Sequence, residues 1–116
     1  MQVLINTDHN ITLTENSTDE LETTVETTLG HFGSHLTRVE IHLTDQSAGR
    51  STGNDIRCLL EARPEGLEPQ FVTDNASTVD VAVHGALHKM LHTLETTFGR
   101  LNQHKGASSM GGIEPR

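Results

Sequence analysis

At 116 residues the chain is long enough for one domain with one modest hydrophobic core. Sixteen acidic residues against eight Lys and Arg give a net charge of −8 with His neutral, which disfavours nucleic-acid binding in general because phosphate neutralisation supplies most non-specific affinity. The three Phe, with no Trp or Tyr, exclude a wide aromatic platform for stacking bases.

The first third of the chain predicts a strand followed by a helix. Residues 2–6 form a short apolar run typical of a strand, and residues 7–16 are polar and turn-like. Ser17 or Thr18 is expected to cap the helix, because acidic residues, which the helix dipole favours in a first turn, follow directly. The apolar face of this helix consists of Leu21, Val25 and Leu29, and the glycines that end the helix are Gly30 and Gly33.

The middle of the chain predicts three strands. Residues 36–44 and residues 56–63 each alternate apolar and polar side chains, so each strand is expected to have one buried and one wet face. Residues 45–54 are predicted to be a loop, and residues 64–69 a turn that leads into a short strand over 69–73. The side chains expected on the buried face are Val39, Ile41, Leu43, Ile56, Cys58 and Leu60.

The last predicted element is a long helix from Thr78 to about Gln103. Its apolar residues recur at three- and four-residue steps: Val83, Leu87, Leu91, Leu94, Phe98 and Leu101. Residues 105–116 are rich in Gly and Ser and are expected to be a disordered tail, which leaves a single domain over 1–104. The order β-α-β-β-β-α predicts an α+β fold of two layers, a four-stranded sheet with two helices packed on one face.

No catalytic motif occurs in the sequence, which lacks a phosphate-binding glycine loop, a paired-His metalloprotease motif and a nucleophile elbow. We therefore expect neither an enzyme nor a cofactor. The single cysteine, Cys58, allows no intrachain disulfide and is expected to pack as a small hydrophobe. A chain without a basic leader or a long apolar run is expected to be cytoplasmic, with no membrane partner.

A stripe of histidines runs along the predicted long helix beside its apolar face. His84, His88 and His92 recur at four-residue steps, and adjacent pairs at this spacing chelate divalent metals. The three span about 12 Å at ~1.5 Å per residue, which is too long for one ion. We therefore expect no metal site, and interpret the stripe as a half-exposed rim of the core that changes charge near neutral pH.

Three short stretches, residues 1–6, 29–43 and 78–90, carry a family resemblance. Together with the order of elements they resemble, over about residues 1–103, the ribosome hibernation-promoting factor and ribosome-associated inhibitor family, also called sigma-factor modulation proteins. The resemblance implies the β-α-β-β-β-α fold. It also implies binding to the small ribosomal subunit, in the channel used by messenger and transfer RNA, and inhibition of translation in starved or resting cells.

The resemblance further implies an RNA-binding surface of basic side chains along the two helices. Lys89 matches a family lysine, and His92 stands where the family tends to have arginine. The basic run expected just after His92 is missing, so Arg100 and Lys105 are the next cations along the chain. Strand alternation adds three candidates on the outer face of the sheet, which are Arg38, Arg57 and Arg63.

The first predicted helix departs from this pattern, because it carries acidic residues and no Lys or Arg. These acidic residues are Asp19, Glu20, Glu22 and Glu26. Such a surface repels phosphates and weakens RNA affinity. The first hypothesis is a ribosome-associated stress factor, and two further hypotheses, ranked below it, stay open. One is an acidic module that keeps the fold, has lost ribosomal RNA binding and meets a protein partner through this helix; the other is an enzyme or metal binder at the His stripe. The sequence predicts no oligomeric state.

Overall fold

The computed structural model describes residues 1–8, 10–46 and 55–106, with 100–106 described as backbone alone. The elements follow the predicted order, with one added 3-10 helix. Their bounds are β1 (Gln2–Thr7), α1 (Glu15–Leu29), η1 (Gly30–His35), β2 (Leu36–Asp45), β3 (Ile56–Pro64), β4 (Gln70–Ala76) and α2 (Val79–Gly106). No helix in this part of the chain has both the length and the apolar character needed to cross a membrane.

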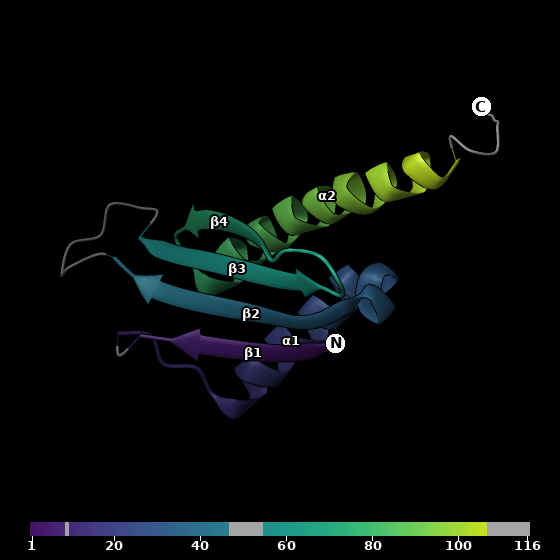
Figure 1. The fold of residues 1–116 in the computed structure, drawn as a ribbon. Coiled ribbons are helices and arrows are strands. Elements are labelled where there is room, and N and C mark those ends of the chain that lie inside the picture. Colours follow the sequence, from purple (N-terminus) through teal and green to yellow (C-terminus); the bar gives the residue numbers. More distant parts are fainter. Residues whose placement is uncertain (9, 47–54, 107–116) are drawn as a thin grey trace.

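The four strands form one sheet in the order β1-β2-β3-β4. Strand β1 runs parallel to β2, whereas β2, β3 and β4 are antiparallel to their neighbours. A parallel pair needs a crossover connection, and α1 supplies it between β1 and β2. Both helices lie behind the sheet in Figure 1, and the face toward the viewer is left open. The predicted two-layer α+β fold is therefore confirmed.

The hydrophobic core lies between the sheet and the two helices, as the alternation predicts. Most of the side chains predicted for it are buried, namely Leu21, Val25, Leu29, Val39, Ile41, Leu43, Cys58, Leu60, Val83, Leu87 and Leu94. Leu91, Phe98 and Ile56 are only half-buried, whereas Met90 is fully buried. The buried stripe of α2 runs through positions 83, 86, 87, 90 and 94, so Leu91 lies at its edge.

The start of α1 differs from the prediction. Thr14, rather than Ser17 or Thr18, is the N-cap, and its Oγ1 accepts a hydrogen bond of 3.1 Å from the backbone N–H of Ser17. The prediction was wrong because it placed the cap at the first acidic cluster, whereas this cap allows the helix to begin one turn earlier. The buried side chain of Ile11 holds the chain just before the cap against the core.

Helix α1 ends at Leu29, and a 3-10 helix begins directly at Gly30. The chain continues as η1, whose buried Phe32 stacks on Phe98 of α2 with ring centroids 5.2 Å apart. This stack joins the connection between α1 and β2 to the distal part of α2. The glycines predicted to end the first helix, Gly30 and Gly33, thus lie in a packed 3-10 helix that follows α1.

The last strand and the last helix are both longer than expected. Strand β4 continues to Ala76 rather than stopping at residue 73, and α2 continues to Gly106. Residues 47–54 of the predicted loop and 107–116 of the predicted tail lie outside the described residues. The division of the chain at residue 104 therefore stays a prediction.

Helix α2 meets β4 at a point with no room for a side chain. A Cβ built on Gly85 would lie 2.6 Å from Cγ of Asp74, which projects from the helix-facing side of β4. Lys89, one helical turn further on, forms an ion pair of 3.0 Å with Asp74 Oδ1 and donates a 2.7 Å hydrogen bond to the carbonyl of Thr73. We call this group (Gly85, Asp74, Thr73 and Lys89) the α2–β4 contact.

We expect Leu87→Ala to lower the free energy of unfolding by about 2–5 kcal/mol, because the side chain is 1% exposed and its removal leaves a cavity. Val81→Ala is the matched control on the same helix, since Val81 is 57% exposed and should change stability by less than about 0.5 kcal/mol. Urea unfolding of both variants measures the difference. Equal effects of the two substitutions would contradict the described packing of α2.

The α2–β4 contact predicts opposite effects of substitution at two glycines of α2, Gly85 and Gly99. A Cβ added at Gly99 would have no neighbouring atom within 4 Å, so Gly99→Ala should stabilise the protein by about 0.5–1 kcal/mol through helix propensity. Gly85→Ala should destabilise it despite the same gain, because Asp74 must move and its ion pair with Lys89 is disturbed. Thermal melts of the two variants test the pair, and stabilisation by both would refute the close approach.

Candidate nucleic-acid interface

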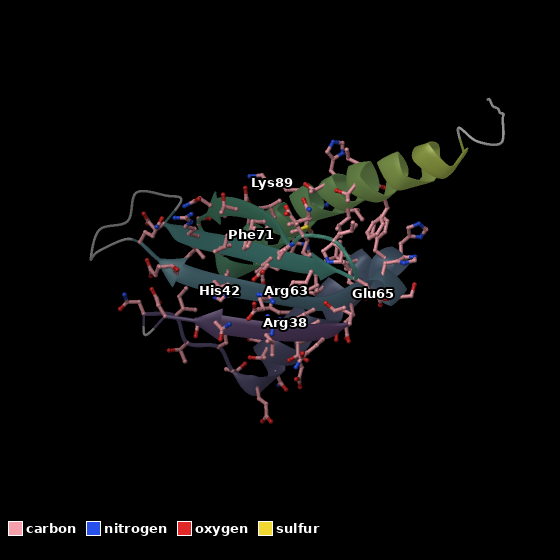
Figure 2. All side chains as sticks on the ribbon, viewed as in Figure 1. Arg38, His42, Arg63, Glu65, Phe71 and Lys89 are labelled. Carbon is pink, nitrogen blue, oxygen red and sulfur yellow. The ribbon has the colours of Figure 1, made fainter. Side chains whose placement is uncertain are left out.

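The cations of the chain are unevenly divided between the two layers. Arg38, Arg57 and Arg63 lie on the open face of the sheet, since each alternates with a buried residue of its strand. Figure 2 shows Arg38 and Arg63 on the near face, which the helices do not cover. Lys89 is the one other Lys or Arg whose side chain the structure describes. Of the predicted RNA contacts, Arg100 and Lys105 lie on α2, and their side chains are outside the description.

Four charged residues make a compact group at one end of this open face, which we call the charge quartet (Arg38, Glu40, Glu61 and Arg63). Arg38 lies directly opposite Arg63 across β2 and β3, and Glu40 lies opposite Glu61. Like charges in direct opposition are unfavourable. Each arginine instead pairs with the glutamate two residues along its own strand, so the charges of the quartet cancel.

The two ion pairs of the quartet differ in geometry and exposure. Arg63 Nε donates a 3.0 Å hydrogen bond to Glu61 Oε2, and the Glu61 side chain is only 8% exposed. Arg38 Nη2 lies 3.6 Å from Glu40 Oε2, while Arg38 Nε is buried with no hydrogen-bond acceptor among the described groups. A buried donor without an acceptor costs free energy. The Arg38 guanidinium therefore has an unused donor as well as its positive charge.

Arg57 stands apart from the quartet at the far end of β3. Its cross-strand neighbours are Thr44 of β2 and Asn75 of β4, neither of which carries a charge. The side chain is exposed, and no ion pair to it is found among the described residues. Arg57 is therefore the cation of the open face whose charge is least compensated.

Lys89 has a structural role in addition to the predicted RNA contact. Its side chain is 53% exposed, but its ammonium group is shared between Asp74 and the Thr73 carbonyl in the α2–β4 contact. Strand β4 is an edge strand, and the hydrogen bond from Lys89 to the Thr73 carbonyl ties α2 to it. A phosphate at Lys89 would have to compete with Asp74, which lowers the value of Lys89 as a binding residue.

The three histidines of the stripe are more exposed than predicted. His84, His88 and His92 are all exposed on α2, rather than half-exposed at the rim of the core. They stay in line along the helix and do not converge. Among the described residues no three His, Cys, Asp or Glu side chains are close enough to share a metal ion.

The other histidine side chains that the structure describes fall in two places that the sequence did not connect. His31 and His35 of η1 contact the two stacked phenylalanines, with centroid distances of 5.0 Å to Phe32 and 5.4 Å to Phe98. His42 lies on the open face opposite Leu59. The contacts of His31 and His35 depend on the 3-10 helix, which had no signal in the hydrophobic pattern.

Cys58 is buried in the core opposite Asp74. Burial, with a smaller contribution from the negative charge of Asp74, raises the pKa of the Cys58 thiol to about 12. The thiol stays protonated at neutral pH and is a poor nucleophile. The prediction that Cys58 packs as a small hydrophobe is confirmed.

Two features of the surface were missed in the sequence. Phe71 projects from the open face and is 60% exposed, beside Glu61 of the quartet. A shallow hollow of about 230 Å³ lies where the N-terminal turns of α1 and α2 meet, and its lining includes the acidic Glu20 and Asp80. Strand alternation could have placed Phe71 on the open face. No local pattern in the sequence could have predicted that the N-terminal turns of α1 and α2 lie together.

The fold matches the solved structures of other proteins. It matches the crystal structure of the N-terminal domain of Protein Y from Thermus thermophilus with a TM-score of 0.64 and 15% identity, covering 84% of this chain and 99% of that one. It also matches a ribosomal subunit interface protein from Coxiella burnetii with a TM-score of 0.64 and 11% identity, covering 85% and 99%. No protein-family model and no curated protein matches the sequence. At these identities the likeness shows that the chain has the fold of these proteins.

Proposed function

We propose that the protein is a ribosome-associated stress factor that binds the small ribosomal subunit through ribosomal RNA and inhibits translation, which would make it cytoplasmic. The observation that carries the proposal is the fold, because it extends over 99% of a Protein Y N-terminal domain and of a ribosomal subunit interface protein. The short stretches at residues 1–6, 29–43 and 78–90 support the same family from the sequence side.

The distribution of charge makes one layer far more suitable for RNA than the other. Helix α1 carries Glu15 and the four acidic residues noted above, and no Lys or Arg precedes Arg38 in the chain. Phosphates would be repelled there. The RNA-facing cations in this proposal are those of the open face (Arg38, Arg57 and Arg63), joined by Lys89, His92, Arg100 and Lys105 on α2.

A second candidate function rests on α1 itself. Its exposed surface combines several carboxylates with threonines and offers no cation, which suits a basic protein partner rather than RNA. In this alternative the chain keeps the fold as an acidic interaction module and does not bind ribosomal RNA. The two functions are separated by the response of subunit binding to salt and pH.

Subunit binding is predicted to strengthen as pH falls from about 8 to about 6. Between Thr78 and His104, Asp80 and Glu95 balance Lys89 and Arg100, so protonation of the four histidines in this segment would bring its formal charge from zero to +4. Imidazole gains its proton in this range, and nearby phosphate favours the charged form. Affinity should also fall steeply between about 50 and 200 mM salt, because bound phosphates displace counterions. Pelleting with purified small subunits across pH and salt measures both effects.

A pair of variants with equal changes in charge tests whether α2 takes part. His92→Glu combined with Arg100→Gln should weaken pelleting at least tenfold. Thr23→Glu combined with Thr27→Glu makes the same change in net charge on α1 when His92 is counted as neutral, and should have little effect, so the two variants are compared at about pH 8. Lys89 is left intact because its loss would disturb the α2–β4 contact. If the wild-type chain does not pellet at pH 6 and low salt, the ribosome proposal fails and the acidic module replaces it.

A further inference from the structure

The open face of the sheet carries an exposed aromatic ring in a chain that has few. Phe32 and Phe98 are stacked on each other, whereas Phe71 is 60% exposed on the face that no helix covers. Half-buried Leu4 and Leu59 lie on the same face, on β1 and β3. One exposed phenylalanine is ordinary by itself. Phe71 is notable as a candidate binding residue because it lies on the same face of the sheet as the arginines.

Phe71 lies beside a strip with a cation at each end. It is the cross-strand neighbour of Glu61, and Arg63 follows two residues further along β3. Arg57 is at the other end of the same strand, about 20 Å from Arg63 at ~3.3 Å per residue. Between them the open face of β3 carries Leu59 and Glu61, and the half-buried His42 of β2 lies opposite Leu59. The strip is about as long as a few nucleotides, and the exposed ring of Phe71 lies beside it, nearer to Arg63 than to Arg57.

The acidic character of the whole chain does not extend to this strip. Three of the four Lys and Arg side chains that the structure describes lie on the open face, and α1, which carries the acidic residues, lies on the opposite side of the sheet (Figure 1). Charges separated by more than about 10 Å are largely screened at 0.1 M salt. Glu40 and Glu61, the acids of β2 and β3 nearest to Phe71 on this face, are both paired with arginines.

We propose that the open face of the sheet is a docking surface for single-stranded RNA, in which Phe71 stacks on an unpaired base while Arg57 and Arg63 contact phosphates on either side. The proposal rests on the proposed function in that ribosomal RNA would supply the strand. Stacking on a side chain requires a base that is not enclosed in a duplex.

Because the chain contains no Trp, a tryptophan introduced at position 71 would be its single indole, and the fluorescence of that indole can report the stacking. In the Phe71→Trp variant the single indole should be quenched when a short unstructured RNA oligonucleotide is added, and the affinity should equal or exceed that of the wild type. Val81→Trp places an indole at a similarly exposed position on α2 and should not be quenched. The same RNA annealed to its complement should quench neither variant.

Truncation and charge removal give independent measurements by fluorescence anisotropy with the labelled oligonucleotide. Phe71→Ala should weaken binding by about 5- to 100-fold, the range expected for one stacked base, whereas Val81→Ala should leave it unchanged. Arg57→Gln should lower the slope of log affinity against log salt by about one, as expected for one phosphate contact. Circular dichroism melts establish that each variant is folded.

The outcomes separate this proposal from the ribosome proposal. Pelleting with subunits that is unaffected by Phe71→Ala and Arg57→Gln would overturn the docking surface and leave the ribosome proposal standing. Oligonucleotide binding that depends on Phe71, without subunit pelleting, would support the docking surface and refute the ribosome proposal. If the indole of the Phe71→Trp variant is quenched by rising protein concentration alone, the face belongs to a second copy of the chain and the proposal is overturned. Equal affinities for the single-stranded oligonucleotide and for the duplex would overturn the proposal as well.

Discussion

The placement of α2 depends on the absence of a side chain at position 85. Because Gly85 allows the helix backbone to approach β4, Asp74 is held between the helix and the buried Cys58, and Lys89 reaches back over the strand to neutralise it. Without this ion pair a carboxylate on the core side of the sheet would be costly to retain. The same contact uses part of the charge of Lys89. Gly85 therefore affects how closely α2 approaches β4, and through Asp74 it affects how much of the charge of Lys89 is available to a ligand.

The two layers of the protein have opposite electrostatic characters. Helix α1 presents carboxylates, whereas the open face of the sheet presents three arginines, two of which are balanced within the quartet. The charges therefore favour the open face of the sheet over α1 as a surface for an anionic partner.

The sequence predicts the architecture well because the hydrophobic pattern is regular in β2, β3 and α2. The buried stripe of α2, for example, follows from the spacing of Val83, Leu87 and Leu94, although Met90 was passed over because its side chain is less distinctive as a core residue. Thr14 was missed because several residues near the start of α1 can cap a helix and only the packing of the preceding segment decides among them. The pairing of Arg63 with Glu61 and of Lys89 with Asp74 required knowledge of rotamers and register, which a pattern of residue types does not contain.

The parallel pairing of β1 with β2 has a consequence for the order of folding. Gln2 is aligned with Arg38, 36 residues later, whereas β2, β3 and β4 pair with strands adjacent to them in the chain. Closing a longer loop costs more entropy and slows folding. We expect the β2–β4 meander to assemble with α2 first, and β1 with α1 to join as the final unit. The same unit should be the first to detach in native-state hydrogen exchange, which makes the acidic half of the molecule its most labile half.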